Sequence, residues 1–416
     1  MTMTQYILLR HRDIPRLNQL EVYLQHGGFE AFKSAVTTQT PQQVIDQIKA
    51  SGLRGRGGAG FPTGLKWSLL TKDVFPRYVV ANSDESEPGT FKDREILENN
   101  PYQFLEGLMI AAYAAQANLA FNYMRGEFAD LAAKVEANIA ELYAHGWLGQ
   151  NLFGTGYSLE IRNKLGAGAY ICGEESALLE SIEGQRGQPK PKPPFPADKG
   201  LYQKPTVINN AETLTNLPMI LARGSAWFRT FGTPSSPGVK IFCLSGSVNR
   251  PGNYELPLGT TFRELIEKHG GGAPGGRKVK GFIPSGASSN VLPATDEILD
   301  CPMDYESVAQ KGSGLGSASV IVFDESVDMV WAALKIARFF KHESCGKCTP
   351  CRVGTRLMLE LLERVYNGEG QPDDLRQIER LGGVIQRGSL CGLGQAAPNA
   401  ILSSLRHFRA EFEAHL

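Results

Sequence analysis

Three cysteines near the C-terminal end constrain this chain more than any other feature. Cys345, Cys348 and Cys351 are each separated by two residues, and Cys391 follows farther along the chain. Two-residue spacers let successive thiolates turn inward around one cubane, while a remote fourth cysteine closes the site. A four-cysteine zinc site is the alternative, but it normally pairs two separate C-x2-C knuckles. The spacing therefore predicts a [4Fe–4S] cluster on these four cysteines.

The other three cysteines, Cys172, Cys243 and Cys301, have no ligand spacing. Cys243 lies in an apolar run and is expected to be a small core residue, and core packing is also the expectation for Cys172. Seven cysteines in 416 residues do not make a disulfide framework. We therefore expect a reducing compartment, the cytoplasm.

Composition argues against two classes of partner. Lys plus Arg and Asp plus Glu both number 43, so bulk charge offers no attraction to nucleic acid or to an anionic membrane. No stretch reaches the roughly 18 apolar residues of a membrane span, and Gln116 and Asn118 interrupt the best candidate, 108–121. The N-terminus shows no signal-peptide pattern. The length predicts two to three domains.

The first half of the chain has an α/β pattern. A helix start signal with apolar spacing predicts a helix over 41–50, and a short apolar run predicts a buried strand over 78–81. A helical pattern dominates 101–144. Strand, loop and helix alternate again over 157–182. A long Pro/Lys/Gly segment, 184–204, is expected to be an irregular functional loop.

The second half changes in texture near residue 239. Short strands at 241–244, 279–283 and 320–323, with a helix at 261–269, predict a small mixed β module. After residue 324 the pattern is helical, and a helix ending near residue 341 leads into the cysteines.

Residues 55–60 read Gly-Arg-Gly-Gly-Ala-Gly, which satisfies G-x-G-x-x-G as a string. The dinucleotide fingerprint also needs a preceding strand, and residues 44–51 predict a helix, so an ordinary Rossmann assignment fails. Glycines still let backbone N–H groups approach a phosphate or a flat ring, and the following helix offers its positive end. Arg56 and Lys66 add cationic partners. We predict a ligand loop, because a plain turn does not need so many glycines.

Carboxylates follow two of the predicted strands, at 82–87 and 173–176. Solvated charge is the usual explanation, but these segments are expected at the same sheet edge as the glycine loop, where ligands of open sheets bind. Carboxylates there suit ribose hydroxyls and ring N–H donors, and they repel additional phosphate. Asn209 and Asn210 could bond a flavin ring edge, and a helix N-cap is the alternative for Asn210.

Six strings resemble one family, the NADH-binding flavoprotein subunit of respiratory complex I, which is the 51 kDa subunit in mitochondria. They are RGRGGAGFPTGLKW at 54–67, NSDESEPGT at 82–90, ICGEES at 171–176, KPPFP at 192–196, INN at 208–210 and ESCGKCTPCR at 343–352. The resemblance runs from about residue 20 to the end. It implies an α/β chain with three parts: a Rossmann-like FMN- and NADH-binding domain with an N-terminal arm at 1–235, a ubiquitin-like β-grasp domain of SLBB type at 236–324, and a helical bundle with the [4Fe–4S] cluster at 325–416.

The resemblance also implies two ligand sites. The residues expected around FMN are Gly55, Arg56, Gly57, Gly58, Lys66, Asn82, Asp84, Glu85, Ser86, Gly173, Glu174, Asn209 and Asn210. Those expected near NADH are Phe61, Glu87, Glu175, Lys192 and Phe195, with the two phenylalanines stacked on the adenine. One departure is visible, because Leu69 replaces a second stacking aromatic of relatives. No catalytic side chain is expected, since the flavin carries the hydride chemistry.

The implied activity is that of an NADH:quinone oxidoreductase flavoprotein subunit. It takes a hydride from NADH onto FMN and passes electrons singly to its cluster, then to a small [2Fe–2S] subunit and a large iron–sulfur subunit. The diaphorase subunit of a soluble NAD-dependent hydrogenase or formate dehydrogenase is the alternative, although the minimal length favours complex I. The expected location is cytoplasmic and peripheral at the inner face of the cytoplasmic membrane, or the matrix side in a mitochondrion. A non-catalytic scaffold with a structural metal is the competing class.

Overall fold

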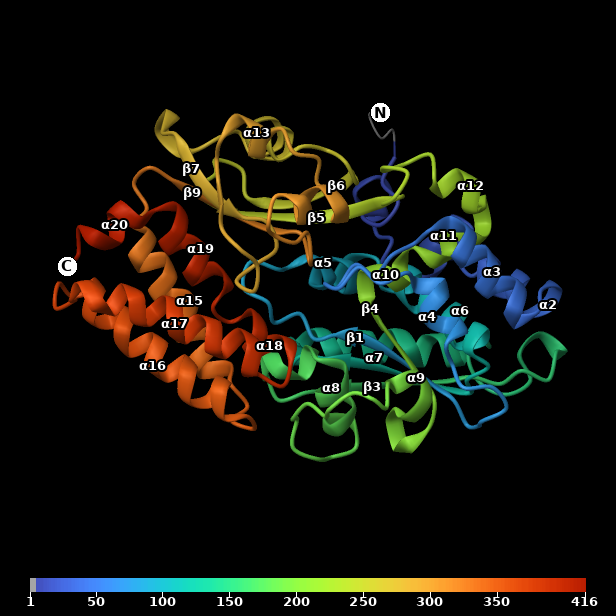
Figure 1. Ribbon diagram of the computed structural model, residues 1–416. Coiled ribbons are helices and arrows are strands. Elements are labelled where there is room, and N and C mark those ends of the chain that lie inside the picture. Colours follow the sequence, from blue (N-terminus) through green and yellow to red (C-terminus); the bar gives the residue numbers. More distant parts are fainter. Residues whose placement is uncertain (1–4) are drawn as a thin grey trace. The chain divides into compact units, whose positions relative to one another are not determined.

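Short apolar runs bounded by polar turns form a four-stranded parallel sheet in the computed structural model, which describes residues 5–416 (Figure 1). The strands are β1 (Tyr78–Ser83), β2 (Leu119–Met124), β3 (Glu160–Leu165) and β4 (Thr206–Asn210), in the order β3-β2-β1-β4. The chain runs outward from β1 to β3 and returns on the other side of β1 as β4. In open α/β sheets, such a reversal leaves a crevice at the carboxyl ends of the two strands. The predicted α/β class is confirmed.

The expected helical pattern over 101–144 is wrong in its middle. β2 lies between α6 (Pro101–Ala115) and α7 (Ala129–Ala144). Gln116 ends α6 in the left-handed conformation, with φ 56°, and so redirects the chain into the strand. The strand is short and buried between alanine-rich helices, so its own apolar residues extend their pattern.

The helix before the glycine loop is confirmed as α3 (Pro41–Ser51). Thr40 and Gln43 form a capping box at its start, and Gly52 ends it with φ 70°. The other helices associated with this sheet are α1 (Leu20–Gln25), α2 (Glu30–Thr38), α4 (Thr63–Ser68), α5 (Lys92–Asn99), α8 (Glu175–Ile182), α9 (Pro196–Lys199), α10 (Ala211–Thr215), α11 (Leu217–Arg223) and α12 (Ser225–Phe228). Short 3-10 turns are η1 (Arg10–Arg12), η2 (Gly126–Phe128), η3 (Leu152–Gly154), η4 (Tyr170–Gly173) and η5 (Leu201–Gln203). The segment 184–204, expected to be irregular, thus contains two short helical turns.

Helices α6 and α10 approach each other at Gly107. A Cβ at this position would lie 2.0 Å from the backbone oxygen of Leu214. Helix propensity alone would make Gly107→Ala stabilising by about 1 kcal/mol. Because the obstacle is backbone, we instead expect a loss of about 1–3 kcal/mol in unfolding free energy, measured by denaturant titration. Gly314→Ala is the matched control, since a Cβ there meets no atom of the described residues within 4 Å, and a Gly107→Ala chain as stable as wild type would contradict this packing.

A second sheet follows in the chain. Its strands are β5 (Val239–Gly246), β6 (Gly252–Pro257), β7 (Val279–Ile283), β8 (Leu292–Pro293) and β9 (Ser319–Asp324), in the order β6-β5-β9-β7-β8. β5 and β9 are parallel, whereas β7 is antiparallel to both β8 and β9. The short helical elements here are η6 (Glu264–His269), which is a π-helix, η7 (Pro274–Gly276), α13 (Asp296–Leu299) and α14 (Tyr305–Gln310). The mixed β module predicted from residue 239 is therefore present.

Helices fill the remainder of the chain, as predicted. They are α15 (Met329–Glu343), α16 (Thr349–Tyr366), α17 (Pro372–Gly388), α18 (Gly392–Ala396), α19 (Asn399–His407) and α20 (Arg409–Glu413). Asp328 caps α15 by accepting the N–H groups of Val330 and Trp331. Between residues 5 and 416, no helix is both long and apolar enough to cross a membrane.

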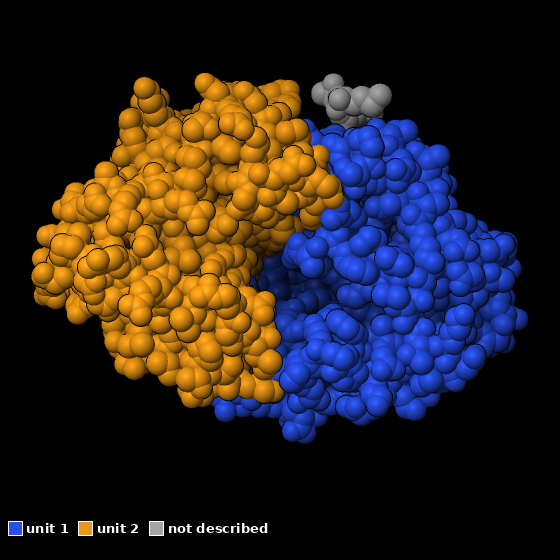
Figure 2. Space-filling view, in the orientation of Figure 1, with its two compact units in different colours: residues 1–86, 91–241, 255–259 blue, residues 87–90, 242–254, 260–416 orange. Residues whose placement is uncertain are grey.

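The chain divides into two units with separate hydrophobic cores (Figure 2). The first unit contains the residues up to 86 together with 91–241 and 255–259, and the second contains 87–90, 242–254 and 260–416. The predicted boundaries at residues 235 and 324 stay predictions. Residues 1–4 of the predicted first domain lie outside the described residues.

An N-terminal arm is tied into the first unit by one carboxylate. Glu255, buried in β6, accepts the backbone N–H groups of Ile7, Leu8 and Leu9 at 2.8–3.1 Å. These donors lie outside any helix or sheet, so the carboxylate satisfies groups that burial would otherwise leave unpaired.

Candidate functional site

The reversal between β1 and β4 brings together two predicted segments. Asn82 is in register with Asn210, and Ala81 with Asn209, at the carboxyl ends of these adjacent strands. The Asn210 side chain accepts the N–H of Glu212 and so caps α10, which confirms the helix N-cap expected as the alternative for this residue. Its amide also donates to Asp93 at 2.6 Å. Asn210 therefore has a structural role at the crevice.

The glycine loop lies against this crevice. A Cβ on Gly57 would be 2.8 Å from the Asn210 Cβ, so this position requires glycine. The base of the loop is closed by a bridge between Arg54 and Pro62 and by the Gly55 N–H donating to the Phe61 oxygen at 2.9 Å. The tip of the loop (Gly57, Gly58 and Ala59) is exposed. Its backbone N–H groups are thus accessible to a ligand.

Helix α4 joins the glycine loop to β4. Lys66 Nζ donates to the Ile208 oxygen, and Trp67 Nε1 donates to Asn209 Oδ1, both at 2.8 Å. Trp67 is fully buried and had no predicted role. Its position in the resembling string is the signal that could have identified it as the residue orienting Asn209.

The second acidic segment meets the first at the end of β1. Asn82 Nδ2 donates to the Gly173 oxygen at 2.9 Å. A Cβ on Gly173 would lie 3.3 Å from Asp84 Oδ2, which leaves little room for a side chain. Ser86 Oγ donates to Asp84 Oδ1 at 3.4 Å. The structure therefore brings Asn82, Asp84, Ser86 and Gly173 together beside β4.

Two predicted ligand carboxylates instead stabilise helix starts. Glu85 accepts the N–H groups of Asp93 and Arg94 at 2.8 and 3.0 Å. Burial, with the charge of Asp93, raises the pKa of Glu85 to about 7. Glu174 caps α8 by accepting the N–H groups of Ser176 and Ala177. Both side chains are therefore engaged in the fold at the edge of the site.

Charges alternate along one side of the crevice. Glu175 lies between Lys66, at 3.6 Å, and Lys192, at 2.5 Å, and Lys192 also reaches Glu174 at 3.0 Å. Burial alone would raise the pKa of Glu175, but the two lysines outweigh it and hold the pKa below its usual value. Glu175 thus keeps its negative charge at neutral pH.

Apolar side chains in these segments remain exposed. Phe61 and Phe195, the rings predicted to stack on adenine, are 45% and 57% exposed, and Leu69 is 57% exposed. Exposed aromatic rings at the ends of ligand-binding segments are available for stacking. Glu87 belongs to the second unit, where it accepts the Ser288 N–H at 2.8 Å, and its predicted place near NADH stays a prediction.

A buried charge network lies in the first unit and was missed by the sequence analysis. Lys92 Nζ is 2.7 Å from Asp93 Oδ1 and 3.0 Å from Glu212 Oε2, and Lys240 Nζ is 3.3 Å from the same Glu212 oxygen. Burial would raise the pKa of Glu212, but Lys240 and Lys92 hold it low, and burial lowers the pKa of Lys240 to about 8. The only signal was Lys240 itself, a charge within an apolar strand.

The four predicted ligand cysteines surround one end of the C-terminal helices. Burial raises the pKa of the Cys351 thiol to about 11, and the charges of Cys348, Cys391 and Cys345 raise it further, against a 3.2 Å hydrogen bond with Ser344. Cys348 stands at the N-terminal end of α16, which favours negative charge on its sulfur. Arg352 donates to the Gly346 oxygen at 2.7 Å and so fixes the loop between the first two cysteines.

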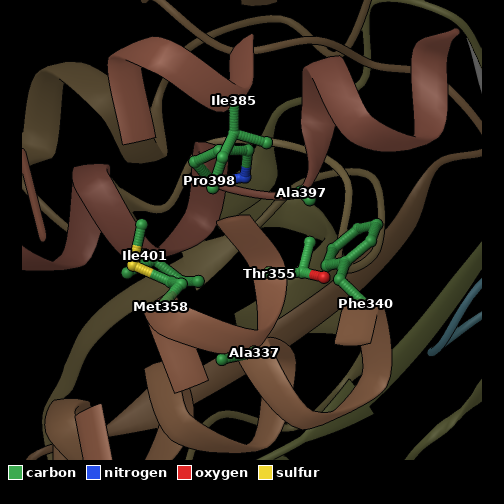
Figure 3. A pocket seen from close by; sticks show the side chains of 8 residues that line it. All are labelled: Ala337, Phe340, Thr355, Met358, Ile385, Ala397, Pro398 and Ile401. Atoms are coloured by element: carbon green, nitrogen blue, oxygen red, sulfur yellow. The ribbon is translucent and has the colours of Figure 1, made fainter. Parts of the chain in front are cut away.

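The helices behind Cys351 enclose a small apolar cavity (Figure 3). Its lining residues are Ala337, Phe340, Thr355, Met358, Ile385, Ala397, Pro398 and Ile401. The Thr355 hydroxyl donates to the Cys351 oxygen at 2.8 Å, which satisfies it within the helix. Among the described residues, no three His, Cys, Asp or Glu side chains form a site for a single metal ion. A cubane spreads its thiolates over four irons and does not require that spacing.

Comparison with known proteins places this chain in a family. Family models match it over residues 48–219 (Nuo51 FMN-binding domain), 241–287 (SLBB domain) and 331–415 (NADH-ubiquinone oxidoreductase-F iron-sulfur binding region). An F subunit of NADH-quinone oxidoreductase from Rhizobium meliloti (strain 1021), the second of that name, is 50% identical over 415 residues, covering 100% of this chain and 98% of the relative. The chain belongs to the family of NADH-quinone oxidoreductase F subunits.

Two further relatives agree with this family membership. The NADH-quinone oxidoreductase F subunit of Streptomyces coelicolor (strain ATCC BAA-471 / A3(2) / M145) is 47% identical over 95% of this chain and 88% of its own length. The NAD+-reducing [NiFe]-hydrogenase, solved in the H2-reduced state, matches with a TM-score of 0.86 and 38% identity over 98% of this chain. This chain spans 66% of that hydrogenase chain. The predicted family and its two cofactors, FMN and a [4Fe–4S] cluster, are confirmed.

Proposed function

We propose that this chain is the NADH-oxidising flavoprotein subunit of an NADH:quinone oxidoreductase. It would pass electrons singly to its [4Fe–4S] cluster, and then to a small [2Fe–2S] subunit and a large iron–sulfur subunit of the same complex. The observation that carries the proposal is the meeting of the glycine loop with Asn82 and Asn210 at the β1/β4 crevice, in a chain that is 50% identical along its length to an F subunit of such an enzyme.

The residues of the glycine loop fit an FMN phosphate. Arg56 is fully buried, and its Nε and Nη1 atoms have no hydrogen-bond partner among the described residues, so a cationic side chain below the loop is available to negative charge. A Cβ on Gly58 would meet no described atom within 4 Å, which leaves space above the loop tip. The backbone of Gly55, Gly57 and Gly58 would hold the phosphate, and the predicted residues of β1, β4 and the acidic segments would surround the ring.

The neighbouring charges and rings suit a dinucleotide. Phe61 and Phe195 would stack on the adenine, and Lys192 would face its phosphates. Glu175 would accept from the ribose hydroxyls and repel a 2′-phosphate, which selects NADH over NADPH. Leu69 would provide apolar contact in place of a ring.

The cofactors supply the redox chemistry, and this chain supplies binding and orientation. When bound, FMN accepts a hydride from the nicotinamide, and the [4Fe–4S] cluster carries single electrons. Cys345, Cys348, Cys351 and Cys391 would hold the cluster, and the N-terminal end of α16 would offset part of its negative charge.

The architecture beyond the first sheet is proposed by the same likeness. Residues 236–324 would form a ubiquitin-like β-grasp domain, supported by the SLBB match and the mixed five-stranded sheet. Residues 325–416 would form a helical bundle around the cluster, supported by α15 to α19. The complex would place the chain peripherally at the cytoplasmic face of the membrane, or at the matrix face in a mitochondrion.

A second candidate is the diaphorase subunit of a soluble NAD-dependent enzyme. The TM-score of 0.86 with the NAD+-reducing [NiFe]-hydrogenase favours it. Both candidates use the same cofactors and differ only in the partner subunits. Identification of the subunits that co-purify with this chain separates them.

Visible absorption and cofactor analysis test the redox proposal directly. We expect the purified chain to be yellow-brown, with flavin bands, one FMN and about four irons per chain, and to oxidise NADH with an artificial acceptor. A colourless protein that contains zinc would exclude the redox proposal and support a structural metal site.

A further inference from the structure

Lys240 is a charged residue inside an apolar strand. Its neighbours Val239 and Ile241 are fully buried, and so is Lys240 itself. A buried ammonium is costly unless it is paired and hydrogen-bonded, so this position requires a specific arrangement of partners. None of the residues proposed to touch FMN or NADH includes Lys240, Glu212 or Thr213.

The Lys240 ammonium connects Glu212 to the glycine loop. Its Nζ donates to the backbone oxygen of Arg56 at 2.8 Å and to Glu212 Oε2 at 3.3 Å. Glu212 is itself fixed, because Oε1 accepts the Ile241 N–H at 2.9 Å and Oε2 pairs with Lys92. The donor to the Arg56 oxygen is therefore held rigidly from below.

A planar trans peptide transmits this contact to the other side of the loop. The C=O of Arg56 and the N–H of Gly57 belong to one peptide unit and point in opposite directions. Since the carbonyl is taken by buried Lys240, the Gly57 N–H is directed away from the buried network. Gly57 and Gly58 are exposed, so that direction leads out of the core.

The preceding peptide is held from the same side. The N–H of Arg56 donates to Thr213 Oγ1 at 2.8 Å, and Thr213 follows Glu212 in α10. Both peptides that flank Arg56 are thus fixed by buried side chains outside the loop. Preset N–H groups bind an anion without reorganising, which is the advantage of a preorganised site.

We propose that Lys240 and Thr213 are positioning residues for the glycine loop, and that by fixing both peptides of Arg56 they direct the N–H groups of the loop tip toward the phosphate of bound flavin. This inference rests on the proposed FMN site. Neither residue touches the flavin. Their effect is specific for the phosphate, because the loop tip is where the phosphate is proposed to bind.

Comparison of FMN with riboflavin isolates the phosphate. The full chain, freed of flavin, is titrated with each compound, and quenching of flavin fluorescence gives the two Kd values. For Lys240→Met we expect the Kd for FMN to rise about tenfold, which corresponds to about 1.4 kcal/mol, and the Kd for riboflavin to stay unchanged. A residue with a merely structural role would weaken both compounds equally.

Lys280→Met is the matched control, because Lys280 is a partly buried lysine paired with Glu411 at 2.7 Å in the second unit. It should change neither Kd. Thr213→Val, which is nearly isosteric, tests the second anchor and should also weaken FMN but not riboflavin. It serves on its own if Lys240→Met does not fold.

Two results separate this inference from the proposed function. A wild-type chain that prefers FMN, together with variants that keep the full preference or weaken both flavins equally, would overturn the positioning role alone. A wild-type chain that binds FMN and riboflavin equally would overturn the phosphate site on the glycine loop, and the inference with it.

Discussion

Cys391→Ala is expected to abolish the visible signal of the iron–sulfur cluster while FMN remains bound. A [4Fe–4S] cluster uses four thiolates, and Cys391 is the one ligand supplied from outside the 345–351 segment. The residues proposed for FMN all belong to the first unit, and the four cysteines belong to the second. NADH oxidation by an artificial acceptor should therefore continue, whereas quinone reduction by the assembled complex should be lost.

Iron analysis, the visible spectrum and flavin content of the Cys391→Ala protein test this prediction together. Cys301→Ala is the control, since Cys301 is a thiol with 3% exposure and no ligand spacing. It should retain both cofactors. Loss of FMN together with the cluster in Cys391→Ala would show that the two sites are not independent, and retention of the cluster would remove Cys391 from its ligand set.

Glu175→Gln is expected to relax the preference for NADH over NADPH about tenfold or more in the ratio of kcat/KM values. Like charges a few ångströms apart repel by several kcal/mol in a partly buried site, and about 1.4 kcal/mol corresponds to tenfold. The lysines on either side keep Glu175 ionised. Its neutralisation removes the repulsion and also frees Lys66 and Lys192 to bind the 2′-phosphate.

Steady-state kinetics with both dinucleotides, followed through an artificial acceptor, measure this ratio. Glu180→Gln provides the control, because Glu180 lies in the same helix α8 and forms an ion pair with Lys190. That variant should keep the wild-type ratio. An unchanged preference in Glu175→Gln would rule out a role for this carboxylate in selecting the dinucleotide.

Local sequence predicted those parts of the site that depend on backbone conformation or adjacency in the chain. The cysteine spacing, the clustered glycines of the loop and the carboxylates after strands are such features. α3 was recognised because its capping box and terminal glycine are local signals. β2 was missed because a short buried strand between alanine-rich helices has no distinguishing period of its own.

Features that depend on the return of distant segments could not be predicted. Trp67 and Asn209 are separated in sequence yet share a hydrogen bond, and Lys240 reaches Arg56 only because β5 lies beneath the loop. Glu85 and Glu174 were expected at the ligands, but helix starts nearby supply N–H donors that engage their carboxylates. A sequence shows which residues are charged, whereas the fold decides which groups compete for that charge.

The contact between Glu255 and the N-terminal arm has a consequence for synthesis. A stretch of 248 residues separates Ile7 from its carboxylate partner. At roughly 5–20 residues per second on the ribosome, the arm must wait about 12 to 50 s for that partner to emerge. Ile7, Leu8 and Leu9 are apolar and stay exposed during this interval. The nascent chain therefore presents a hydrophobic leading end suited to chaperones, and the first unit can close only after more than half of the protein has been made.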